Sequence, residues 1–71
     1  MNPLPYREVE RKLKAAGFEI VGQKGSHIKF AKTTATGTLT AIVPHHSEVA
    51  IGTLRSILRQ AGLTPDEFKA L

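Results

Sequence analysis

The stretch QKGSHIKF, residues 23–30, places a histidine between a glycine–serine pair and a lysine. The imidazole of His27 suits proton transfer, because the pKa of histidine lies near neutral pH. Lys29, two residues later, could stabilise negative charge. Gly25 would let the backbone approach a phosphate closely, and the N–H groups of Gly25 and Ser26 could help to hold it. The residue types therefore fit a site that binds and transforms a phosphate ester.

Metal-free cleavage of RNA is a reaction that such a site could perform. It requires a base for the 2′-hydroxyl proton, an acid for the leaving 5′-oxygen, and positive charge for the phosphorane-like transition state. His27 could transfer a proton, with Lys24 and Lys29 as nearby positive charge. A single histidine has little pattern specificity, so an exposed turn histidine without a role stays open as the alternative.

Two further histidines, His45 and His46, follow the proline that ends the predicted third strand. Together with His27 they could form a metal site, but adjacent strand residues point to opposite sides and chelate poorly. No cysteine or carboxylate completes the set, so we expect neither a metal nor another cofactor. His45 stays a candidate for proton transfer or phosphate contact, whereas His46 fits an ordinary loop histidine.

Two arginines, Arg55 and Arg59, lie four residues apart on a predicted helix, on the face away from Leu54 and Leu58. Such charges most often form a solvated helix face. They could also contact phosphates or an acidic protein partner, and both interpretations stay open.

Apolar periodicity and glycines outline the elements that would position these residues. Val9, Leu13 and Ala16 recur at helical spacing and predict a helix over residues 5–16. Gly17 fits the left-handed position after a helix end. Ion pairs are expected at i,i+4 spacing on this helix, between Glu8 and Lys12 and between Glu10 and Lys14.

Three strands are predicted next, at residues 18–24, 27–32 and 38–43. In the first strand, Phe18 and Ile20 should share the core face. Short turns between the strands imply an antiparallel meander with the helices packed on one face.

The remaining third of the chain predicts a loop and two helices. After a loop at residues 45–50, an amphipathic helix runs to Gly62. Thr64 and Glu67 form a capping-box pattern around Pro65, which opens a short last helix. The expected fold class is therefore α+β, with the order α-β-β-β-α and a short C-terminal helix.

The predicted hairpin between the second and third strands brings distant residues together. If it turns around residues 35–36, facing positions sum to 71 or 72, and His27 lies beside Pro44 and His45. Alternation places His27 and Lys29 on the face opposite Ile28, away from the helices. That open face could also carry His45.

Length and composition limit the possible classes of protein. A chain of 71 residues forms one domain, residues 1–71, with a small core and little room for a buried active site. The absence of cysteine fits a reducing compartment, and no segment approaches the ~20 apolar residues of a membrane span. We expect a cytoplasmic protein. Its formal charge of +4 favours a polyanion or an acidic protein as partner.

The order and spacing of three motifs resemble the HicA toxins of bacterial and archaeal toxin–antitoxin systems. The motifs are GSH at residues 25–27, VPH at residues 43–45 and GTLRSILRQAGL at residues 52–63. The resemblance covers the chain from about Tyr6 to Leu63. It implies a double-stranded-RNA-binding-domain-like fold, metal-independent cleavage of mRNA, and inhibition by a HicB antitoxin in a complex that could be of higher order. It also implies that His27 is the catalytic histidine, whereas it assigns no such role to His45 or His46.

Two other classes of function stay open. The same fold could be a non-catalytic module that binds double-stranded RNA, for which basic clusters would have to span the grooves of an A-form duplex. The chain could also be a protein-interaction domain whose nuclease activity has been lost, although the intact His27 argues against this.

Overall fold

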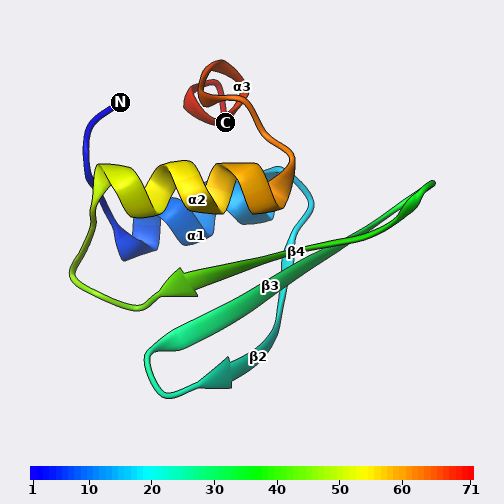
Figure 1. Cartoon of the computed structure of the whole chain (residues 1–71), viewed down its shortest axis with the longest axis horizontal. Helices are drawn as coiled ribbons and strands as arrows, with labels where there is room; N and C mark the ends of the chain where they lie inside the picture. The colour runs from blue at the N-terminus through cyan, green and yellow to red at the C-terminus, as the bar shows by residue number, and fades with distance from the viewer.

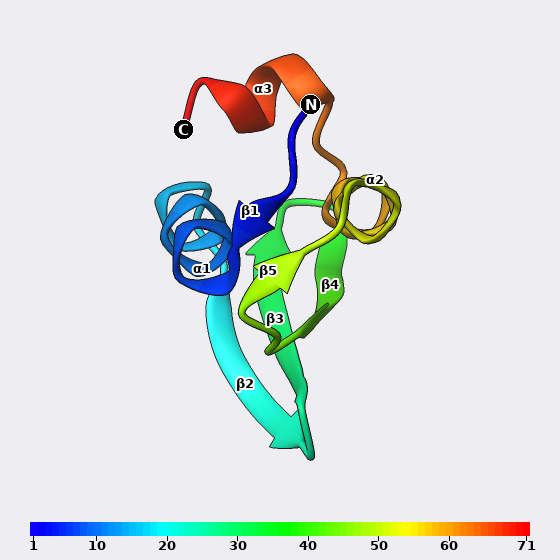
Figure 2. The same cartoon turned by 90° about the vertical axis from the view of Figure 1, so that its left-hand side faces the viewer.

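Two helices cover one face of a three-stranded antiparallel sheet, and a short third helix lies on the far side of the helix layer (Figures 1 and 2). This computed structural model describes all 71 residues. The predicted α+β class, the α-β-β-β-α order and the C-terminal helix are confirmed. The elements are β1 (Leu4–Pro5), α1 (Tyr6–Ala15), β2 (Glu19–Lys24), β3 (His27–Thr34), β4 (Gly37–Pro44), β5 (Glu48–Val49), α2 (Ile51–Ala61) and α3 (Pro65–Lys69).

The central strand β3 pairs with β2 on one side and with β4 on the other. In the β3–β4 hairpin every pair of facing residues sums to 71, from His27 opposite Pro44 to Thr34 opposite Gly37. The predicted register is therefore confirmed. Both strands of the hairpin are longer than predicted, and its tip projects beyond the helices (Figure 1).

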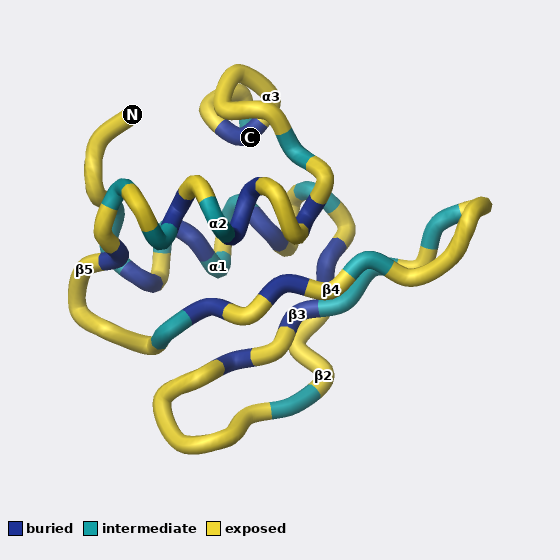
Figure 3. Tube along the Cα trace, in the orientation of Figure 1, coloured by how far each residue is buried: buried dark blue, intermediate teal, exposed yellow.

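The core lies between the sheet and the helices, and it contains no buried charged side chain. Ile28 and Phe30 of β3 and Val43 of β4 belong to it, which leaves the alternate residues of these strands on the helix-free face. Figure 3 shows buried segments alternating with exposed ones along β3 and β4. Phe30 and Val43 are fully buried. None of the three helices combines the length and the apolarity that crossing a membrane requires.

Ile20 lies opposite the core residue Phe30 in the β2–β3 ladder, so it is on the predicted face of the sheet, but unlike Phe18 it is not buried. Phe18 is 2% exposed, but Ile20 is 44% exposed. The pairing of β2 with β3 shifts register between Ile20 and Gly22, so one residue of β2 has no partner. The bulge follows Ile20 and bends the strand. The exposure of Ile20 agrees with its place on β2, which is an edge strand of the sheet.

The segment predicted as a loop at residues 45–50 contains a short strand. Leu4 of β1 lies opposite Val49 of β5, and Pro5 lies opposite Glu48. Val49 is 1% exposed and belongs to the core. Figure 2 shows this pair facing the viewer between α1 and α2. A two-residue strand is too short to show a period, which is why the sequence did not predict it.

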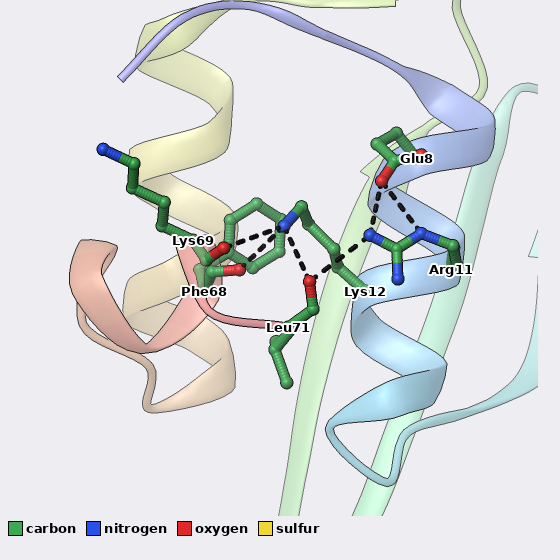
Figure 4. Close-up of polar contacts among 6 residues, drawn as sticks. All are labelled: Glu8, Arg11, Lys12, Phe68, Lys69 and Leu71. Carbon is green, nitrogen blue, oxygen red and sulfur yellow. Dashed lines mark hydrogen bonds and ion pairs between the residues drawn. The ribbon is translucent and has the colours of Figure 1, made fainter.

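One of the two ion pairs predicted on α1 is replaced by other contacts. Glu10 and Lys14 pair as expected, at 3.3 Å. Glu8 instead accepts a hydrogen bond from Nε of Arg11, at 2.8 Å. Lys12 points to the C-terminal segment, where its ammonium lies 3.1 Å from the main-chain oxygens of Phe68 and Leu71 (Figure 4).

The C-terminal helix forms as its sequence predicts. Both hydrogen bonds of the capping box between Thr64 and Glu67 are present, and Pro65 occupies the first turn. The backbone N–H of Thr64 holds the pKa of Glu67 below its usual value. Phe68 is buried, so α3 adds to the core. Gly17 and Gly62, which end α1 and α2, have the positive φ angles expected of them.

Candidate functional site

The helix-free face of the sheet presents His27 and Lys29. Both belong to β3 and are exposed, because their neighbours Ile28 and Phe30 take the alternate positions in the core. The placement agrees with the expectation from alternation. His27 is the first residue of β3, so it stands at the end of the sheet, beside the turn that joins β2 to β3.

A shallow hollow of about 350 Å³ surrounds these two side chains. It is lined by Gly22, Gln23, Lys24, His27, Lys29 and Ile42. Gly22 lies opposite Lys29 on β2, and a Cβ atom placed there would meet no atom within 4 Å. The missing side chain of Gly22 therefore helps to keep this part of the sheet open.

Two lysines supply positive charge to the hollow. Lys24 lies opposite His27 in the β2–β3 ladder, and Lys29 is two residues from it on β3. No carboxylate lines the hollow, and no three histidine, aspartate or glutamate side chains are placed to hold a metal ion. The donor set of one imidazole and two ammonium groups suits proton transfer beside a bound anion.

The predicted turn residues Gly25 and Ser26 adjoin the hollow without lining it. Gly25 has a φ of +59°, a left-handed conformation that glycine adopts at little cost. Its carbonyl accepts a hydrogen bond of 3.1 Å from the side-chain amide of Gln23. The carbonyl of Ser26 accepts one from the backbone N–H of His45, which extends the pairing one residue beyond His27 and Pro44.

The structure separates the side chain of His45 from that of His27. The ring of His45 lies on Tyr6 of α1, with 4.0 Å between the ring centroids and 34° between the planes. His45 therefore faces the helix side of the molecule, where it lines a second hollow with Arg7 and His46. Alternation could not place it, because the chain leaves β4 at Pro44.

The arginines of α2 are also remote from the hollow around His27. Arg55 and Arg59 are exposed and flank a small depression of about 220 Å³ that reaches Leu63 and Pro65. Helix α2 covers the opposite face of the sheet (Figure 1). The basic surface of these arginines is therefore separate from the hollow around His27.

Sequence reasoning missed Gly22, Gln23 and Ile42 as lining residues. Ile42 is 40% exposed and lies opposite Lys29 on β4, so the pairing register could have placed it there. Gly22 had a weaker signal, because an isolated glycine within a strand often marks a bulge or a close approach by another molecule.

Comparison with known proteins assigns the family. Residues 6–63 match the family described as HicA toxin of bacterial toxin-antitoxin. A search of curated proteins gave no match. The matched range holds α1, the sheet and α2, whereas α3 lies beyond it. Because the match spans most of the chain, this protein belongs to the HicA family of toxins of bacterial toxin–antitoxin systems.

Proposed function

We propose that this toxin is an endoribonuclease that cleaves mRNA by metal-independent acid–base catalysis at His27. One observation carries the proposal. The histidine of the GSH motif stands exposed at the end of β3, in an open hollow with Lys24 and Lys29, in a chain of the HicA family. A hollow on an open sheet face admits a polymer, which an enclosed pocket would exclude.

The proposed reaction uses the 2′-hydroxyl of the RNA as the nucleophile. His27 acts in proton transfer, and the chemistry assigns it either the 2′-hydroxyl proton or the 5′-oxygen of the leaving strand. The 2′-oxygen forms a bond to phosphorus as the bond to the 5′-oxygen breaks, which gives a 2′,3′-cyclic phosphate and a 5′-hydroxyl. Lys24 and Lys29 stabilise the negative charge of the transition state. Gly25 and Ser26 shape the adjoining turn and support the phosphate.

A HicB-type antitoxin is the proposed inhibitor. It would block the enzyme by covering the hollow around His27, with acidic side chains against Lys29. The basic surface of Arg55 and Arg59 is a second place for acidic groups of the antitoxin, or for RNA phosphates. Two separate basic surfaces are compatible with a larger toxin–antitoxin assembly.

Cleavage of a defined RNA by the purified toxin tests the proposed chemistry. We expect cleavage to persist in EDTA and to leave cyclic phosphate ends. An RNA with a single 2′-deoxynucleotide at the cleaved position is the matched control, and it should resist cleavage at that position only. Loss of activity in EDTA, or cleavage of the deoxy control, would contradict the proposal.

The alternative is a non-catalytic module that binds double-stranded RNA. It is favoured by the α-β-β-β-α fold and by the formal charge of +4. Such a module would bind duplex RNA with an affinity that falls steeply as salt rises. It would bind equally well after His27→Ala, and it would leave the RNA intact.

A further inference from the structure

We infer that the second hollow is a subsite for single-stranded RNA, which binds the nucleotide next to the one cleaved at His27. It has a volume of about 380 Å³ and lies between the start of α1 and the loop after β4. This inference rests on the proposed function, because it assigns a further part of the same substrate. The lining residues are Pro5, Tyr6, Arg7, His45, His46 and Ser47.

Tyr6 and His45 form a platform on which a base can stack. Tyr6 is 8% exposed, and its hydroxyl donates a hydrogen bond of 2.9 Å to Glu10. The buried phenol therefore holds one face of the His45 ring, at 4.0 Å between centroids. His45 is itself exposed, so the opposite face of its imidazole is available to a ligand. Stacking on a protein ring is the usual way in which single-stranded nucleic acids bind.

Arg7 is the free cation of α1. The other three basic side chains of this helix have partners within the protein. Arg11 pairs with Glu8, Lys14 pairs with Glu10, and Lys12 is held by main-chain oxygens of the C-terminal segment. Arg7 forms no ion pair and lines a hollow that contains no carboxylate. Its guanidinium is therefore suited to a phosphate group of the RNA backbone.

The backbone segments that carry His27 and His45 meet at the end of the sheet. His27 pairs with Pro44, and the next residue along β4 is His45, whose N–H binds the carbonyl of Ser26. One residue of a strand advances the chain by about 3.3 Å. The inferred path of the RNA strand runs over the end of the sheet, from a phosphate beside His27 to the His45 platform on the helix side. A stiff duplex cannot bend around this edge, which favours single-stranded RNA.

Binding is measured in the His27→Ala background, so that cleavage does not interfere. The probe is an unstructured 20-nucleotide RNA with a fluorescent label, titrated at several salt concentrations. His45→Ala should weaken binding by about tenfold without changing the salt dependence, because it removes stacking. His45→Phe keeps a ring and should restore the affinity. Arg7→Gln should lower the slope of log K against log salt by about 0.7, because one phosphate contact is lost.

Lys69→Gln is the matched control for Arg7→Gln. It removes the same charge from α3, outside the hollow, and should change neither the affinity nor the slope beyond a small non-specific effect. Equal binding by the Arg7→Gln, His45→Ala and control proteins would overturn the subsite. That result would leave the proposed function intact if the wild type still cleaves RNA. A wild type that binds but does not cleave would overturn the proposed function alone.

Discussion

Filling the hollow around His27 should slow RNA cleavage without loss of stability. Gly22→Val places a side chain opposite Lys29, where a Cβ meets no atom within 4 Å and the backbone does not have a positive φ. Glycine within a strand lowers the free energy of unfolding by about 0.5–1 kcal/mol relative to alanine, and valine favours the strand conformation further. The free energy of unfolding should therefore rise by about 0.5–1 kcal/mol.

The cost to catalysis follows from what the valine displaces. Its methyl groups occupy part of the 350 Å³ hollow and separate the substrate phosphate from Lys29. A hydrogen bond to a charged group contributes about 1.5–3 kcal/mol. Its loss in the transition state lowers kcat/KM by about ten- to a hundredfold.

The assay combines urea unfolding, followed by circular dichroism, with cleavage of a labelled RNA. Gly52→Ala is the matched control, since Gly52 also has open space around its Cβ but lies on α2, outside the hollow. It should stabilise the protein to a similar extent and leave cleavage unchanged. Wild-type cleavage by Gly22→Val would refute the claim that the substrate occupies this hollow. Marked destabilisation would refute the geometry assigned to Gly22.

Two further predictions concern α1 and its contacts. Lys12→Met should lower the free energy of unfolding by about 1–3 kcal/mol, because three main-chain oxygens and the Phe68 ring lose the cation that they contact. Amide hydrogen exchange in α3 should become faster, and unchanged exchange there would contradict this prediction. Tyr6 is the only tyrosine, and burial together with Glu10 raises its pKa to about 12. In the unfolded chain the Tyr6 phenol ionises near pH 10.0, before it does so in the folded protein. The stability that the neutral phenol gives the folded protein is therefore complete below pH 10.0 and is lost as the pH rises through about 12. Ultraviolet absorbance of the tyrosinate should show this midpoint, and a midpoint near 10 in the folded protein would contradict it.

The sequence predicted the parts of the fold that depend on period and turn length. The two-residue turn at residues 35–36 fixes the register of the β3–β4 hairpin, and that register places His27 beside Pro44. Alternation then places His27 and Lys29 on the face of the sheet that points away from Phe30. These inferences need only local geometry, which is why they agree with the structure.

The parts that could not be predicted depend on contacts between distant segments. The stack of His45 on Tyr6 joins residues that no local pattern relates, and so does the contact of Lys12 with the C-terminal oxygens. The β-bulge in β2 places Gly22 on the same face as Lys29, because a single unpaired residue reverses every later face of a strand. The hollow itself depends on an absent side chain at Gly22, which carries no periodic signal.

The most direct test of the central claim is induced expression of the wild type and of His27→Ala, with growth and transcript integrity measured together. The exposed position of His27 means that its replacement should leave the fold intact, which circular dichroism of the purified protein verifies. The wild type should arrest growth and fragment mRNA, and His27→Ala should do neither. Equal toxicity and equal mRNA fragmentation by a folded His27→Ala protein would contradict the assignment of His27 as the catalytic residue.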